Sequence, residues 1–323
     1  MSSICRLISS LPLNAAGNLL KTGILRELFE LSQVSTEAYD LAKNTIQLNG
    51  VQGQINIYFE KLTSVRLCLG REILMWDFYE NRDPERFELE NFEKKTWKLN
   101  NDIDGTTTCI EYCQMSKNGY GCNLNSIEEV LKLIEYIANL FNASIVDLCI
   151  GKRNFRSCLK FESRKMQYLG AIQSSETLKK CQKVHVHGGT VSHEEMRRVL
   201  EGWSEEVNRM RIWCHPEPNF QYDRIISVPS LCIFGATWFK GPMLLKLDCK
   251  EVTIHTWCLT NEDINTWLHQ WMNSSCKKLE KLEIDILFVN MELISCYEDT
   301  WRSREAEQEY ALNMDKITDG LSE

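Results

Sequence analysis

The chain has 323 residues, of which 43% are hydrophobic and 25% are charged. This composition is ordinary for a globular protein, and the length allows a sizeable buried core. The formal net charge of −8 argues against a general nucleic-acid or membrane-surface binder, because phosphate contacts need a concentrated lysine and arginine face.

The first residues, MSSICRLISSLPLNAAGNLL, lack a basic start followed by a continuous apolar stretch and a small-residue cleavage site. No run of about 18 apolar residues, which a membrane-spanning helix requires, occurs in the sequence. The 14 cysteines are scattered singly through runs such as SVRLCLG and IVDLCIG, where a thiol behaves as a small buried hydrophobe. We therefore expect a protein of a reducing compartment, the cytoplasm or the nucleus, without membrane contact.

Residues 1–45 are predicted to form a small helical unit, because apolar residues recur there at spacings typical of one helix face. These residues are Leu19, Leu20, Ile24, Leu28, Leu31 and Val34. From 46 to 80 the pattern changes to period two in QINIYFE, SVRLCLG and EILMWDFYE, which predicts a meander of antiparallel strands. The charged stretch 81–104 follows, so residues 46–104 are expected to be a β-rich connecting segment with a domain linker near its end.

Three later helices are predicted from one repeated start signal, a hydroxyl residue at the N-cap and an acidic residue three positions later. The pairs are Ser126 with Glu129, Ser192 with Glu195, and Thr260 with Asp263. In a capping box the hydroxyl accepts the backbone N–H of the third helical residue, whose acid reaches back. Asp263 is shorter than a glutamate, so the third match is looser.

After each cap, apolar residues follow at offsets of four, seven, eight and eleven, which is one buried stripe of an amphipathic helix. The stripes are Val130, Leu133, Ile134 and Ile137; Met196, Val199, Leu200 and Trp203; and Ile264, Trp267, Leu268 and Trp271. Strand-like runs flank these helices. They are SIVDLCI at 144, CQKVHVH at 181, NRMRIWC at 208, CKEVTIH at 249 and KLEKLEIDI at 278, with further strands expected near 106, 158 and 229.

Strand, helix and strand joined by short connections favour right-handed crossovers and parallel strands. We therefore predict an α/β fold in which residues 105–297 form a βα-repeat arc with a mainly parallel sheet, similar to an irregular leucine-rich repeat. A closed or doubly wound sheet is the competing geometry. Residues 298–323 form an acidic tail with the composition of a solvated helix.

No catalytic or cofactor site can be assembled from the sequence. Cys109, Cys113 and Cys122 have no nucleophile signature around them, and neither a G-x-G-x-x-G nor a Walker sequence occurs. A hydrolase is therefore a weak alternative, and we expect neither enzymatic activity nor a cofactor.

The string VHVHGGTVSH contains zinc-ligand residue types, His185, His187 and His193, with Cys181 nearby. Zinc prefers a defined tetrahedral set, usually with a second close pair of ligands, and that pair is missing. Alternating histidine and valine is also typical of a half-exposed strand. We therefore expect no metal site.

Alternation along the strands predicts which side chains face away from the core. The outward set is Asp147, His185, His187, Arg211, Trp213, Thr253, His255, Glu283 and Asp285. We predict that a protein target binds this face through all of these residues except Asp147 and Thr253. Arg211 and Trp213 are the expected anchors, because interface energy concentrates in such residues.

The segment LLKLDCKEVTIHTWCLTNEDINTWLHQWMNSSCKKLEKLEI resembles the F-box-associated type 2 domain of the large nematode-expanded F-box family. The residues that fit the family pattern are Leu259, Thr260, Asp263, Ile264, Asn265, Trp267, Leu268, Trp271, Leu279, Glu280, Leu282 and Ile284. Trp267 stands where phenylalanine is usual.

The N-terminus is similar to an F-box, with matches at Leu11-Pro12, Leu19-Leu20, Glu27-Leu28 and Val34-Ser35. The resemblance implies a substrate-recognition subunit of a cullin-RING (SCF-type) ubiquitin ligase, which binds a protein target through its C-terminal domain. A Skp-type adaptor, together with its cullin scaffold, would then dock on a divergent F-box. The adaptor-binding residues implied are Leu11, Pro12, Leu19, Leu20, Ile24, Leu28, Leu31 and Val34. The alternative is a non-enzymatic interaction module that no longer recruits a ligase.

Overall fold

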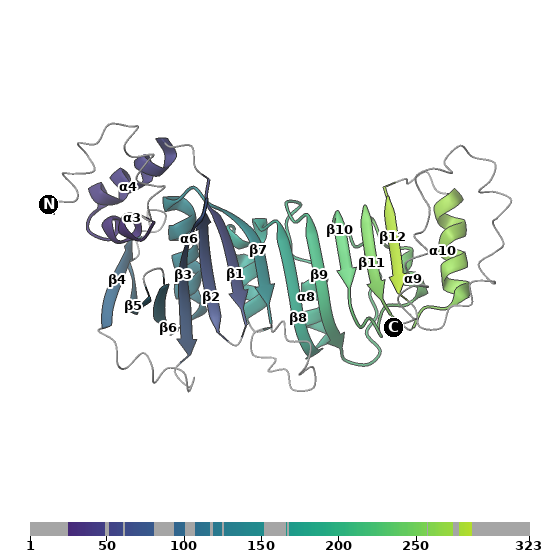
Figure 1. Cartoon of the computed structure of the whole chain (residues 1–323). Coiled ribbons are helices and arrows are strands. Elements are labelled where there is room, and N and C mark those ends of the chain that lie inside the picture. Colours follow the sequence, from purple (N-terminus) through teal and green to yellow (C-terminus); the bar gives the residue numbers. More distant parts are fainter. Residues whose placement is uncertain are drawn as a thin grey trace, which may run out of the picture. The chain divides into compact units, whose positions relative to one another are not determined.

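The computed structural model in Figure 1 describes residues 25–48, 52–60, 62–80, 94–100, 107–116, 119–124, 126–151, 166, 168–256, 258–273 and 278–285. The chain divides into two compact units, residues 1–210 and 211–323. Helices and strands alternate in both units, and most strands from residue 144 onward are paired in parallel. The predicted mixed α/β fold with mainly parallel strands is confirmed at this level.

The sheet of the first unit follows the strand order β8-β7-β1-β2-β3-β6-β5-β4. Its strands are β1 (Gln54–Phe59), β2 (Thr63–Leu69), β3 (Glu72–Glu80), β4 (Lys94–Asn100), β5 (Thr107–Ser116), β6 (Gly119–Leu124), β7 (Ser144–Ile150) and β8 (Lys183–Val191). β1, β2 and β3 form the predicted antiparallel meander. β1 pairs with β7 and β7 with β8 in parallel, so the meander is continued by the first strand–helix–strand crossovers.

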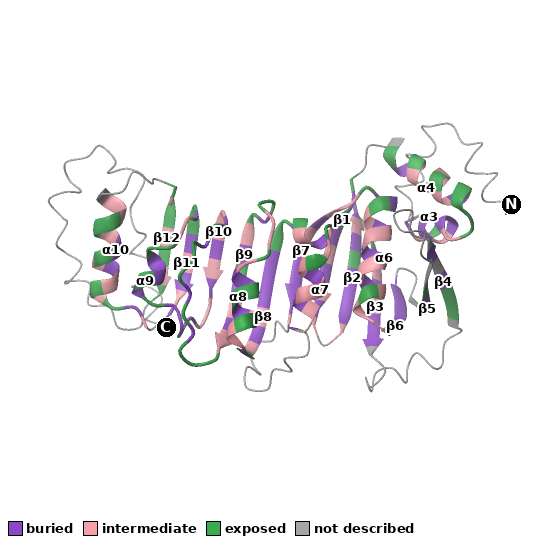
Figure 2. Cartoon of the chain, turned by 180° about the vertical axis from the view of Figure 1, so that it is seen from behind, coloured by how far each residue is buried: buried purple, intermediate pink, exposed green. Residues whose placement is uncertain are grey.

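The helices of the first unit are α3 (Leu25–Ser32), α4 (Thr36–Leu48), α6 (Ile127–Leu140), α7 (Leu169–Ser174), the short 3-10 helix η2 (Leu178–Lys180) and α8 (His193–Leu200). α6, α7 and α8 cover one face of the sheet, behind the strands in Figure 1 and in front of them in Figure 2. The predicted apolar residues of α6 and α8 are buried, except Trp203, which follows α8 and is half-buried. Many strand residues of the sheet are also buried, as the purple parts of Figure 2 show. Alternate strand residues such as Ile57, Leu148 and Val184 supply the other side of the core.

The second unit contains most of β9 (Arg209–Pro216), whose first two residues belong to the first unit, and the elements that follow it. These are β10 (Ser230–Ile233), α9 (Gly241–Leu244), β11 (Glu251–His255), α10 (Asn261–Asn273) and β12 (Lys281–Asp285). The strand order is β12-β11-β10-β9, and β10, β11 and β12 are parallel. Val252 and Ile254 of β11 are buried, as are Ile264 and Trp267 of α10.

Three strands begin in the same way, which gives the parallel part a regular stagger. These strands are β9, β11 and β12. In each, the first residue of the strand and the residue before it donate their N–H groups to one carbonyl group, that of the residue just before the neighbouring strand (β8, β10 or β11). The donor pairs are Asn208 and Arg209 to Gln182, Lys250 and Glu251 to Pro229, and Glu280 and Lys281 to Lys250, at distances from 2.7 to 3.2 Å. A repeated stagger fits a βα repeat, and the leucine-rich-repeat-like arc stays a prediction.

Two strands were not expected. Residues 94–100 lie in the stretch assigned to a linker, yet they form β4, because Trp97 and Leu99 alternate with polar residues and are buried. Residues 119–124 form β6, in which Tyr120, between Gly119 and Gly121, and Cys122 are buried. Helix α4 also continues through residues 46–48, where the meander was expected to begin. The strand expected near 158 and the tail 298–323 lie outside the described residues.

Candidate functional site

Four side chains of the second unit lie next to one another, and we call them the outer row: Trp213 within β9, Phe234 directly after β10, and His255 and Asp285 at the ends of β11 and β12. The rings of Trp213 and Phe234 are stacked with centroids 5.3 Å apart. The Phe234 ring stacks on the His255 imidazole at 4.6 Å and 7°. His255 Nδ1 lies 3.1 Å from Asp285 Oδ2, so the row continues across four neighbouring strands.

Side chains that alternate between the two faces of the sheet place these residues on the same face. Val252 and Ile254 point into the core, so Thr253 and His255 face the opposite side of the sheet. In the parallel ladder, Thr253 pairs with Glu283 and His255 with Asp285, which places equivalent residues of β11 and β12 side by side.

A glycine turn follows Phe234 and shapes the end of the row. Gly235 has a φ of +58°, a conformation that favours glycine, and a Cβ there would lie 2.9 Å from His215 Cε1. The chain therefore turns directly after the aromatic residue, and the Phe234 side chain stays beside Trp213.

Acidic groups border the row on β12. Glu283 Oε1 lies 2.7 Å from Lys281 Nζ, and Glu283 Oε2 accepts a hydrogen bond from the Thr253 hydroxyl at 3.1 Å. The hydrogen bond from Lys281, followed by that from Thr253, holds the pKa of Glu283 below its usual value. This carboxylate therefore stays ionised at neutral pH, paired with Lys281 on the same strand.

The structure brings the predicted target-binding residues of the second unit together and leaves them accessible. Arg211, Glu283 and Asp285 are exposed, whereas Trp213 and His255 are half-buried. Phe234 was missed, because the strand signal VPSLCIF ends on it. Because Ile233 is buried, alternation along the strand would have predicted that Phe234 faces outward.

The two predicted histidines of the first unit are less accessible. His185 is 7% exposed, and its Nε2 lies 3.3 Å from Asp147 Oδ1. His187 is half-buried, and its carbonyl group packs against Gly151. His185 lies on the outward side of β8, as alternation predicts, but its ring is covered and offers little contact area.

The thiols and histidines near the string VHVHGGTVSH do not converge. Burial raises the pKa of the Cys181 thiol to about 12, which keeps it protonated rather than in the thiolate form that nucleophiles and metal ligands need. Within the described ranges, no group of three or more His, Cys, Asp or Glu side chains is arranged to hold a metal ion.

Of the predicted adaptor-binding residues, Leu28, Leu31 and Val34 lie in the described part of the chain. Leu28 and Leu31 are buried, at 2% and 4% exposure, whereas Val34 is 63% exposed after the end of α3. Leu11, Pro12, Leu19, Leu20 and Ile24 lie outside the described residues.

Helix α3 is packed into the first unit through an aromatic cluster. The fully buried Phe29 ring contacts Trp76 at 5.1 Å and Trp97 at 5.0 Å, both edge to face. The Tyr120 hydroxyl donates to Glu30 Oε1 at 3.0 Å, and the Tyr136 hydroxyl lies 2.8 Å from Ser32 Oγ. Burial, with the charge of Glu30 nearby, raises the pKa of Tyr120 well above its usual value, so this hydroxyl stays a donor.

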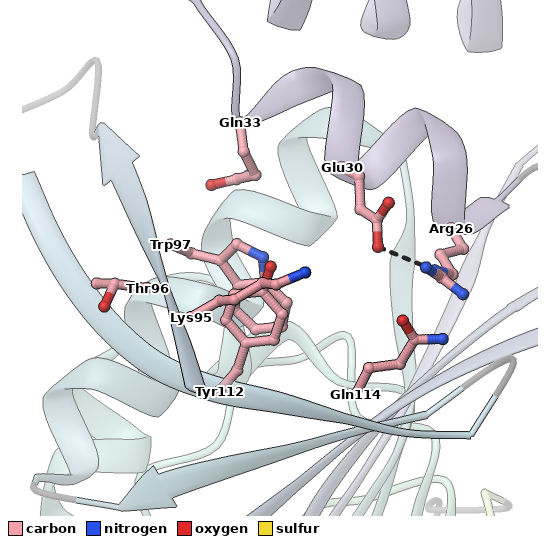
Figure 3. A pocket seen from close by; sticks show the side chains of 8 residues that line it. All are labelled: Arg26, Glu30, Gln33, Lys95, Thr96, Trp97, Tyr112 and Gln114. Atoms are coloured by element: carbon pink, nitrogen blue, oxygen red, sulfur yellow. Dashed lines mark hydrogen bonds and ion pairs between the residues drawn. The ribbon is translucent and has the colours of Figure 1, made fainter. Parts of the chain in front are cut away.

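A pocket of about 430 Å³ lies between α3 and the strands β4 and β5. Figure 3 shows Arg26, Glu30 and Gln33 extending from α3 toward these strands, which supply the remaining lining residues. Those are Lys95, Thr96, Trp97, Tyr112 and Gln114. The Trp97 and Tyr112 rings are stacked at 3.7 Å and 11°, and Arg26 Nε donates to Glu30 Oε1 at 2.9 Å. This pocket was not predicted, because its residues come from three segments that are distant in the chain: α3 and the residue after it, β4 in the stretch assigned to a linker, and β5.

No helix in the described parts of the chain has both the length and the apolar character that crossing a membrane requires.

Comparison with known proteins gives two matches. Residues 219–284 match the family described as F-box associated. A Caenorhabditis elegans protein, the Skn-1 dependent zygotic transcript 15 protein, is 22% identical over 293 residues, which cover 86% of this chain and 79% of the relative. No solved structure matches the chain.

The matched span begins after β9 and ends within β12, so it contains β10, β11 and α10 together with Phe234 and His255 of the outer row. The resemblance stated from Leu259 to Ile284 falls inside it. The second unit of this chain therefore contains an F-box associated region at residues 219–284.

Proposed function

We propose that the protein is an F-box-type substrate-recognition subunit of a cullin-RING ubiquitin ligase. A Skp-type adaptor would bind N-terminal residues, and a protein target would bind the outer row. The observation that carries this proposal is the F-box associated match at residues 219–284, because the same span positions Phe234 and His255.

The geometry of the row supports target binding. Trp213 and Phe234 offer half-buried aromatic surface, which is the kind of residue that dominates interface energies. They stand on or next to paired strands, so little conformational entropy is lost when a partner binds. Glu283 and Asp285 add polar groups at the rim.

Adaptor binding is tested at Val34, which is exposed and is not needed for the core. We expect Val34→Glu to abolish co-purification with a Skp-type adaptor and cullin, because a carboxylate would have to be desolvated at the interface. Ile73→Glu is the matched control, since Ile73 is an exposed apolar residue of β3 far from α3 in sequence. Full adaptor binding by both Val34→Glu and Leu11→Asp would remove the F-box assignment.

Target binding is tested in the full chain by proximity labelling and crosslinking, followed by affinity measurement on the captured protein. Trp213→Ala and Phe234→Ala should each weaken binding by about tenfold or more, as expected for interface anchors. Ile225→Ala is the control, because Ile225 is an exposed apolar residue of the same unit outside the row. Equal affinity of all three variants would place the target elsewhere.

A second function, a target-binding module that recruits no ligase, is favoured by one observation. Leu28 and Leu31, two of the predicted adaptor contacts, are buried within the first unit. The two functions differ in the half-life of the target in cells. Ligase recruitment predicts that Val34→Glu lengthens the half-life while target binding is retained, whereas a simple module predicts no change.

A further inference from the structure

The aromatic rings of the outer row lie between side chains of opposite charge. Trp213, Phe234 and His255 stack on one another across three neighbouring strands, with ring centroids 5.3 and 4.6 Å apart. Each of these side chains is half-buried, so part of each ring remains accessible to a partner. In the proposed function this surface receives the target, and the charges around it restrict which kind of segment can bind.

A cationic side chain lies at one end of the stacked rings. Arg211 precedes Trp213 by two residues on β9, so both side chains leave the same face of the sheet, about 7 Å apart. Arg211 is exposed, and within the described part of the chain its guanidinium makes no ion pair or hydrogen bond. A positive charge next to an aromatic surface favours an acidic side chain in the partner.

Acidic residues are in excess at the other end. On the same face, β11 and β12 carry Glu251, Lys281, Glu283 and Asp285, as alternation and the register of the two strands require. Three acidic residues and one basic residue leave an excess of two negative charges, because Lys281 is paired with Glu283. The Asp285 side chain is 70% exposed, and the one described contact of its carboxylate is with His255 through Oδ2. This end therefore favours a basic side chain in the partner.

The distance between the two ends fits a short extended peptide. β9 to β12 are four neighbouring strands, so the two outer strands are about 14 Å apart at about 4.8 Å between neighbours. An extended chain rises about 3.4 Å per residue and points alternate side chains to the same side. A segment of about five residues therefore crosses the four strands, with its first, third and fifth side chains facing the row.

We propose that the outer row binds an extended segment of the target in which an acidic, an apolar and a basic side chain occupy every second position. This inference rests on the proposed target binding at the outer row and adds the chemistry of the bound segment. The acidic side chain contacts Arg211, the apolar side chain lies on Trp213 and Phe234, and the basic side chain contacts Asp285. Either chain direction satisfies these contacts, because the segment crosses the strands and does not pair with one of them.

Arrayed synthetic peptides test this chemistry on the full chain. Each peptide carries glutamate, leucine and lysine, in either direction, at every second position of a glycine and serine background. These peptides should bind about tenfold more tightly than versions with two glutamates or two lysines, because like charges facing each other across an interface repel. Replacing leucine by serine should abolish binding. Equal binding of all charge patterns, or full binding without leucine, would overturn the proposal.

Charge reversal on the protein predicts a switch in preference and not only a loss of binding. Arg211→Glu makes both ends of the row acidic, so this variant should prefer the peptide with two lysines by about tenfold. Asp285→Lys should prefer the peptide with two glutamates for the corresponding reason. Lys246→Glu, an equal change of charge at an exposed residue outside the row, should keep the wild-type preference. An unchanged preference in both Arg211→Glu and Asp285→Lys would contradict the proposed contacts.

Failure of this inference can be distinguished from failure of the proposed function. If Trp213→Ala weakens binding of the captured target while neither charge reversal alters it, the row binds the target without using these charges. If none of the three variants alters target binding, the target binds elsewhere. A concentration-dependent dimer that Trp213→Ala disrupts, measured by analytical ultracentrifugation, would show that a second copy of the chain occupies the row. Each of these results would overturn the proposed segment.

Discussion

At the scale of single residues, the backbone fixes glycine at one position near the end of β7. Gly151 has a φ of +89° and donates its N–H to the Phe59 carbonyl at 2.8 Å. A Cβ there would lie 1.6 Å from the His187 carbonyl oxygen, a contact that only a shift of β8 could relieve. Gly70, in the turn between β2 and β3, also has a positive φ, of +61°, but a Cβ there would meet nothing within 4 Å.

The two glycines therefore make a matched prediction. Gly151→Ala should lower the free energy of unfolding by about 4 kcal/mol or more, because backbone strain and a steric clash add together. Gly70→Ala should cost only the strain of about 1 kcal/mol. Urea unfolding followed by circular dichroism measures both. Equal losses would show that the approach of β8 to Gly151 is not as close as described.

Asp77 of β3 makes stability depend on pH. Burial raises the pKa of this carboxyl above its usual value, with a smaller opposing effect of the Arg66 charge. A raised pKa in the folded state means that the unfolded chain releases this proton first, so the group lowers stability as pH rises above the usual aspartate value. Asp77→Asn should therefore be more stable than the wild type at pH 7, and the gain should vanish below about pH 4.

The comparison is measured by thermal unfolding of both proteins between pH 3 and pH 8. Asp40→Asn on α4 removes an exposed carboxyl and is the control, for which little change is expected. A gain for Asp77→Asn that is the same at pH 3 and pH 7 would mean that packing, and not ionisation, is responsible.

At the scale of elements, Thr256 holds the carboxyl ends of three strands together. Its backbone N–H donates to the Asp285 carbonyl at 3.1 Å, and its buried hydroxyl donates to the Ala236 carbonyl at 2.7 Å. The same hydroxyl accepts the Cys258 N–H at 3.2 Å. This residue therefore fixes the chain directly after β10, β11 and β12, where the outer row lies.

Thr256→Val keeps the shape of the side chain and removes both hydroxyl bonds. We expect a loss of about 1–3 kcal/mol in the free energy of unfolding, because a carbonyl and an N–H are left unpaired in a buried position. Thr253→Val, the same change three residues earlier, loses an exposed bond to Glu283 and should cost less than about 0.5 kcal/mol. Hydrogen exchange should show faster opening of β11 only in Thr256→Val. Similar losses in the two variants would contradict the role of Thr256.

The helix caps show how far local sequence determines an element. Ser192 and Glu195 form the complete predicted capping box at the start of α8. Thr260 and Asp263 were expected to match more loosely, yet Asp263 accepts the Thr260 N–H at 2.9 Å while its own N–H donates to the Thr260 hydroxyl. At Ser126 the hydroxyl accepts the Glu129 N–H at 3.3 Å. A cap depends on a few adjacent residues, which is why the sequence was sufficient here.

At the scale of the whole molecule, features that depend on residues close in sequence were predicted, whereas features that depend on contacts between distant segments were not. The strands with clear alternation and the three apolar stripes are local patterns, and they place Trp213, His255 and Asp285 on one side of the second unit. In contrast, β3 pairs with β6 although β4 and β5 lie between them in the chain, and no local sequence pattern predicts this pairing. The pocket under α3 likewise depends on β4 and β5, whose polar sequence conceals the buried Trp97.

The packing of α3 leads to a prediction about how the first unit folds. Phe29 is fully buried against Trp76, Trp97, Tyr120 and Tyr136, which belong to β3, β4, β6 and α6. If residues 1–45 were an independent helical domain, a change in α3 would leave the sheet intact. Since Phe29 instead completes the core of the sheet, Phe29→Ala should lower the free energy of unfolding by about 3–5 kcal/mol.

Hydrogen exchange with mass spectrometry distinguishes these possibilities. In Phe29→Ala, the amides of α3, β3 and β6 should lose protection together, because they share one cooperative core. Val34→Ala, at an exposed position beside the same helix, should leave all of them unchanged. Loss of protection in α3 and α4 alone, with β3 and β6 as in the wild type, would show that the N-terminal helices form a separate domain, as a freely docking F-box would require.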